Sequence, residues 1–62
     1  MIIFDGAILN ESNIAYAFVS YSEYSNKWIL KVQMIRGGDI TFSYDSEVKA
    51  NNSLDSLISK IK

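Results

Sequence analysis

Hydrophobic and polar positions alternate along three runs in the middle of the chain, and this two-residue period is typical of β-strands. The runs extend from Ile14 to Ser22, from Trp28 to Arg36 and from Ile40 to Tyr44, and they are rich in β-branched and aromatic residues. The polar segments between them are short enough to connect neighbouring antiparallel strands. The pattern therefore predicts an antiparallel meander of three strands.

The N-terminal segment, residues 2–9, consists of two short apolar runs separated by Asp5 and Gly6. Asp-Gly supplies the two positive φ angles that a type I′ turn requires. We expect this segment to form an additional hairpin or a kinked edge strand.

The C-terminal segment spaces its apolar residues three and four apart, which is the period of an amphipathic helix. Its N-terminus is ambiguous: the helix begins near Ser46, capped by Asp45 or Ser46, or it begins near Ser53, capped by Asn52. Together the elements predict a single α+β domain over residues 1–62, with one helix packed on one face of the sheet. The apolar stripe comprises Ala50, Leu54, Leu57, Ile58 and Ile61.

The register between the strands decides which side chains the helix covers. A five-residue first loop (23–27) and a three-residue second loop (37–39) gather the large residues on one face, which we expect the helix to cover. Two-residue turns at 25–26 and 37–38 are the alternative, and they move the outer strands by one residue and exchange their faces. In the first register the covered face comprises Ile14, Tyr16, Phe18, Trp28, Leu30, Val32, Met34, Ile40, Phe42 and Tyr44.

In this register the opposite face is also partly apolar, beside the polar side chains of Lys31, Gln33, Thr41 and Ser43. One helix cannot cover both faces of a sheet, and an exposed apolar patch often marks an interaction site. The apolar members of this face are therefore our candidate interface residues: Ala15, Ala17, Val19, Tyr21, Ile29 and Ile35.

A chain of 62 residues buries only a small core. Small proteins usually gain the missing stability from disulfides, from a bound metal or from a second subunit. Because the sequence contains neither Cys nor His, the first two routes are nearly closed. We therefore expect a homo-oligomer.

Candidate chemistry is sparse. Without His or Cys, the usual general bases and the thiol nucleophile are missing. The closest carboxylate pair, Asp45 and Glu47, provides too few oxygens for a calcium site, and the Arg36-Gly37-Gly38-Asp39 segment is better explained as a hairpin turn than as a phosphate loop. We expect no enzymatic activity, no catalytic residues, no metal site and no cofactor.

Aromatic and basic residues around the central strand suggest a second hypothesis, in which the sheet binds single-stranded nucleic acid by base stacking and phosphate contacts. Six basic residues are outweighed by seven acidic ones, for a net charge of −1, so general electrostatic attraction to nucleic acid is weak. The contacts under this alternative would be Tyr21, Tyr24, Lys27, Lys31 and Arg36.

These observations favour a small non-enzymatic binding or interaction module that occupies a partner surface or encloses a small ligand between subunits. The bias toward Ile, Asn, Ser, Lys and Tyr is typical of AT-rich genomes, including those of phages, and suggests a phage or mobile-element accessory protein. No apolar run reaches the ~20 residues that a membrane span needs, and the N-terminus lacks the basic region of a signal peptide. We expect a cytoplasmic protein without membrane contact.

Overall fold

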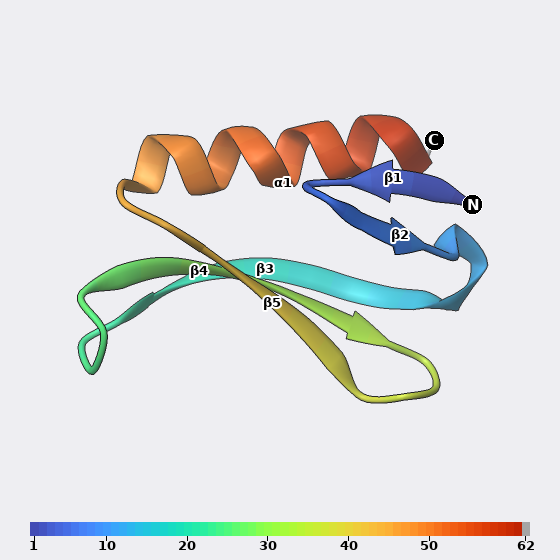
Figure 1. Cartoon of the computed structure of the whole chain (residues 1–62), viewed down its shortest axis with the longest axis horizontal. Coiled ribbons are helices and arrows are strands. Elements are labelled where there is room, and N and C mark those ends of the chain that lie inside the picture. Colours follow the sequence, from blue (N-terminus) through green and yellow to red (C-terminus); the bar gives the residue numbers. More distant parts are fainter. Residues whose placement is uncertain (62) are drawn as a thin grey trace.

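The computed structural model describes residues 1–61, and it has the α+β architecture that the pattern predicts (Figure 1). Lys62, which belongs to the predicted domain, lies outside the described residues. A two-stranded antiparallel sheet and a three-stranded antiparallel meander in the order β3-β4-β5 are combined with a single helix that packs against the meander. The elements are β1 (Ile2–Phe4), β2 (Ala7–Leu9), the 3-10 helix η1 (Glu11–Asn13), β3 (Ile14–Ser22), β4 (Lys27–Met34), β5 (Asp39–Tyr44) and α1 (Glu47–Ile61).

The N-terminal hairpin is the one that Asp-Gly predicts. Asp5 and Gly6 adopt φ angles of 49° and 83°, both in the left-handed region. The hairpin directs Phe4 and Leu9 toward the core, where the ring of Phe4 meets that of Phe42 edge-on at 5.2 Å between centroids. The hairpin therefore forms part of the layer that covers the meander.

The helix begins at the first of the two predicted positions. The hydroxyl oxygen of Ser46 accepts a hydrogen bond from the backbone N–H of Lys49 at 3.2 Å, so Ser46 caps α1. Glu47 lies in the first turn, where a negative charge is favourable. The helix continues without a break through Asn51 and Asn52, whose side chains are exposed to solvent. No helix among the described residues combines the length and apolar character that crossing a membrane requires.

The predicted register between the first two strands of the meander is wrong by one residue. Ala17 pairs with Val32, whereas the preferred register required Phe18 at that position. The connection between β3 and β4 has four residues, 23–26, and Asn26 takes a left-handed φ of 56°. Because side chains alternate between faces, this change of one residue turns Tyr16 and Phe18 away from the helix.

The predicted three-residue loop between β4 and β5 is also wrong, because four residues, 35–38, form the connection and Ile40 pairs with Val32, but the faces predicted for β4 and β5 are confirmed. Ile40, Phe42 and Tyr44 of β5 share the face of Leu30 and Val32. An irregularity in the pairing of β3 between residues 14 and 16 keeps Ile14 on that face as well. Only the part of β3 that follows this irregularity has exchanged its faces.

The core lies between the meander, α1 and the hairpin. Its fully buried members are Leu9, Leu30, Val32 and Leu57, and the partly buried Ala17 and Val19 pack against it. From the hairpin, Phe4 meets Phe42 of β5, whereas α1 packs against β3. The four-residue loop closed by the left-handed Asn26 accompanies the observed register, which places the small side chains of Ala17 and Val19 on the core face.

Replacing Leu57 with Ala tests this core. Leu57 is 0% exposed, so Leu57→Ala should lower the free energy of unfolding by about 2–5 kcal/mol, through lost burial and the cavity left behind. Ile58 is the matched control: the predicted apolar stripe included it together with Ile61, but the two are 41% and 40% exposed, and Ile58 is adjacent to Leu57 on the same helix. Ile58→Ala should cost about 1 kcal/mol or less. Equal losses in urea denaturation would contradict the described packing of α1.

Candidate interaction surface

The face of the three-stranded sheet that points away from α1 is here called the outer face. Figure 1 shows the helix and the hairpin on the other side of this sheet, and no other described element covers the outer face. Its side chains follow from the pairing of the strands: Tyr16, Phe18, Ser20 and Ser22 on β3, Lys27, Ile29, Lys31 and Gln33 on β4, and Asp39, Thr41 and Ser43 on β5.

An exposed aromatic pair is the main apolar feature of the outer face. Tyr16 and Phe18 stack with their ring centroids 6.0 Å apart and an interplanar angle of 23°. Their exposed fractions are 56% and 40%, although both belong to a regular strand. Ile29 lies on the neighbouring strand of the same face and is half-buried. This face therefore presents the aromatic pair and one further apolar side chain beside polar residues.

The charges at this face are balanced by local ion pairs. Lys31 pairs with Asp39 at 3.0 Å between Nζ and Oδ2, and Lys27 pairs with Asp45. The hydrogen bond from Lys27, followed by its positive charge and that of Lys49, lowers the pKa of Asp45. The two lysines that project from the outer face are thus each matched by a carboxylate.

The six residues predicted to form an interface do not form one surface. Ala17, Val19 and Tyr21 lie on the face toward the core, where Tyr21 packs against Trp28. Ile29 lies alone among them on the outer face. The remaining two members, Ala15 at the irregularity of β3 and Ile35 in the turn after β4, are exposed.

The residues of the nucleic-acid alternative are also dispersed. Tyr24 is fully exposed in the β3–β4 turn, and Arg36 lies in the β4–β5 turn at the opposite end of β4. Tyr21 is on the inner face, whereas Lys27 and Lys31 are on the outer face and each is ion-paired. The described fold brings these five residues into no common groove.

Sequence reasoning missed Tyr16 and Phe18, because the predicted register placed them under the helix. The available signal was Asn26, since Asn tolerates the left-handed conformation better than most residues. A left-handed Asn26 closes a four-residue loop.

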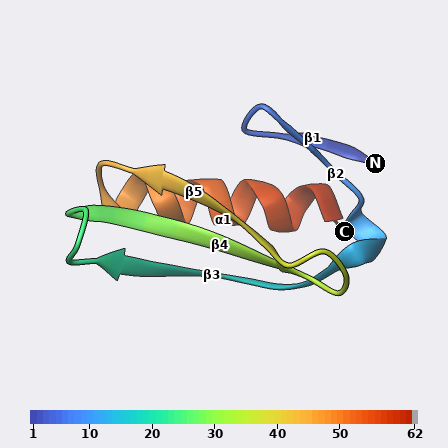
Figure 2. The same cartoon turned by 60° about the horizontal axis from the view of Figure 1, so that its bottom comes forward.

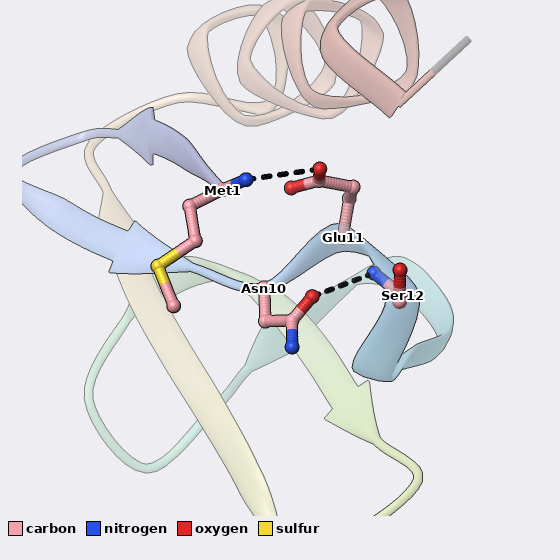
Figure 3. Close-up of polar contacts among 4 residues, drawn as sticks. All are labelled: Met1, Asn10, Glu11 and Ser12. Atoms are coloured by element: carbon pink, nitrogen blue, oxygen red, sulfur yellow. Dashed lines mark hydrogen bonds and ion pairs between the residues drawn. The ribbon is translucent and has the colours of Figure 1, made fainter.

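Polar contacts fix the entry of the chain into β3 (Figure 3). The side-chain oxygen of Asn10 accepts a hydrogen bond from the backbone N–H of Ser12 at 3.1 Å and caps η1. The amino group of Met1 donates to Glu11 Oε1 at 3.0 Å. The backbone N–H of Glu11, together with this amino group, lowers the pKa of the Glu11 carboxyl. The start of β3 is therefore held by the segment that precedes it.

The outer edge of β3 is the second notable feature of this surface. β3 is the terminal strand of its sheet, and Figure 2 shows no other element running along its free edge. Among the described residues, no backbone hydrogen bond joins that edge to another element. All nine residues of the strand are uncharged and none is proline. An open edge and an exposed aromatic pair thus occur on the same strand.

Within residues 1–61 there is neither a pocket nor a group of three or more potential metal-ligating side chains. Comparisons with protein families, with curated proteins and with solved structures found no match to this chain. The candidate site is therefore the surface formed by β3 and the outer face.

The ion pair between Lys27 and Asp45 makes a prediction about pH. Lys27→Met should raise the pKa of the Asp45 carboxyl toward its ordinary value, because the hydrogen bond and the nearby charge are both lost. A carboxyl whose pKa is lowered on folding adds stability above its ordinary pKa and loses it as the pH falls through the folded pKa. As the pH falls, the free energy of unfolding of the variant should therefore decrease less than that of the unmodified chain.

An NMR pH titration of the Asp45 side chain measures this shift directly. Lys31→Met is the matched control, because Lys31 pairs with Asp39 and should leave the pKa of Asp45 unchanged. An unaltered Asp45 pKa in Lys27→Met would show that the ion pair does not form in solution.

Proposed function

We propose that the chain is a non-enzymatic interaction module that acts as a homo-oligomer, and that β3 with the adjoining outer face is its contact surface. The observation that carries this proposal is the combination on β3 of an open strand edge and the exposed Tyr16–Phe18 pair. Edges of this kind pair readily with another strand, and aromatic residues are enriched in protein interfaces.

The small size of the core supports the same proposal. The fully buried side chains of the described chain are few, and large apolar side chains remain exposed on the proposed contact surface, where Tyr16 and Phe18 are 56% and 40% exposed. Burying apolar surface in a second copy gains about 25 cal/mol per Å². Association is thus a direct source of stability for a chain without disulfides.

A second copy is the partner that the charges favour. The net charge of −1 gives little repulsion between copies, and the exposed aromatic pair lies on a strand without charged side chains. In this proposal the assembled oligomer binds the surface of a further partner, or it encloses a small ligand between its subunits. Cytoplasmic location and a phage or mobile-element origin stay predictions from composition.

Solution mass across a dilution series tests the proposal. Light scattering should give a multiple of 7.0 kDa at high concentration and a lower mass on dilution. Because the proposed contact is uncharged, added salt should change this equilibrium little.

Ile3→Ser serves as the control variant, since Ile3 is exposed on the hairpin and lies outside the proposed contact. It should associate like the unmodified chain. A mass of 7.0 kDa at every concentration would contradict the proposed homo-oligomer.

A further inference from the structure

We propose that two copies join edge to edge through β3, antiparallel and about a two-fold axis at Phe18, so that two three-stranded sheets become one sheet of six strands. This inference rests on the proposed homo-oligomeric function and specifies its contact. The occupant of the free edge is a second copy of this chain, in the β-strand addition mode by which extended segments bind open sheet edges.

The edge of β3 carries none of the features that normally prevent such pairing. Natural edge strands are protected by charged side chains, by proline, by short length or by a covering element. The nine residues of β3 include no charge and no proline, and no described element covers the edge. The single irregularity lies between residues 14 and 16, at the start of the strand. Residues 17–22 are left as a regular, unprotected edge.

The opposite edge of the sheet is a poorer candidate. β5 has six residues against the nine of β3, and it begins with the charged Asp39. An antiparallel pairing of two β5 edges would also bring Asp45, which follows the strand, close to the Asp39 of the second copy. Like charges in such proximity oppose association. β3 is therefore the edge that we assign to the contact.

Symmetry restricts the register of this pairing. A two-fold axis perpendicular to the sheet keeps both helices on one side, and residues that face each other must then point to the same side of the sheet. The axis must consequently pass at a residue rather than between two residues. An axis at Phe18 pairs residues 16–20 of each copy, which all follow the irregularity of β3.

The side chains that meet in this register are compatible. On the outer face Phe18 would meet its own copy, and Tyr16 would meet the second copy's Ser20, which gathers four aromatic rings around the axis. On the inner face Ala17 would meet the second copy's Val19, extending the apolar layer. None of the side chains that meet in this stretch carries a charge, so like charges are not opposed.

A charge exchange at Phe18 tests the axis. Phe18→Lys and Phe18→Glu each place like charges opposite one another, and each should raise the dimer dissociation constant about tenfold or more. Mixing the two variants in equal amounts should restore a heterodimer at the concentration where neither associates alone. Thr41→Lys and Thr41→Glu form the matched control pair, because Thr41 lies on the outer face of β5 and should not affect the dimer.

Cysteine cross-linking provides a second measurement, and the natural chain contains no Cys to interfere. Phe18→Cys should oxidise to a covalent dimer, because residues paired across antiparallel strands lie within disulfide reach. Tyr16→Cys alone and Ser20→Cys alone should each form no disulfide-linked homodimer, but the two variants should cross-link to each other when mixed. Ser43→Cys on β5 should form no disulfide-linked dimer under the same oxidation, although its copies still associate through β3.

The outcomes separate this inference from the proposed function. The β3 contact is supported if the two charge variants form a heterodimer when they are mixed and if Phe18→Cys forms a disulfide-linked dimer. A wild-type oligomer with no cross-link through β3, or with a cross-link through Ser43→Cys, overturns the contact while leaving the homo-oligomer intact. A wild-type chain that is monomeric throughout overturns both. Circular dichroism of each variant serves as the control that its fold is the same as that of the unmodified chain.

Discussion

The packing of the hairpin and the helix against the same face of the meander is the constraint on which the remaining structure depends. Phe4 and Leu9 enter the layer between α1 and the sheet, where Leu30, Val32 and Leu57 are also buried. On the side of β3, Ala17 and Val19 complete this layer. β3 therefore turns its small residues inward, and Tyr16 and Phe18 face solvent.

That exchange gives the protein its candidate surface. If β3 were shifted by one residue, the aromatic pair would be buried and the outer face would lose its apolar area. The same strand also ends the sheet and carries no charge along its free edge. The features that support self-association thus arise from the packing of the interior and from the position of β3 in the sheet.

Much of the fold could be predicted from the sequence, because it depends on local signals. Alternation identified the three strands, Asp5 and Gly6 identified the first hairpin, and the spacing around Leu57 identified the helix. The face of β3 could not be predicted in this way. Both registers obey the same alternation, and they differ in the length of the β3–β4 loop, which has four residues and is closed by the left-handed Asn26. The candidate surface was missed for the same reason, since it consists of the side chains that this choice exposes.

Amide hydrogen exchange along β3, measured at high and at low protein concentration, tests the central claim most directly. Successive amides of a strand point alternately toward β4 and toward the free edge. We expect the amides of residues 14–22 that point toward β4 to be protected at all concentrations. The amides that point toward the free edge should be protected only at high concentration. Protection of β3 that does not change with concentration would contradict the account.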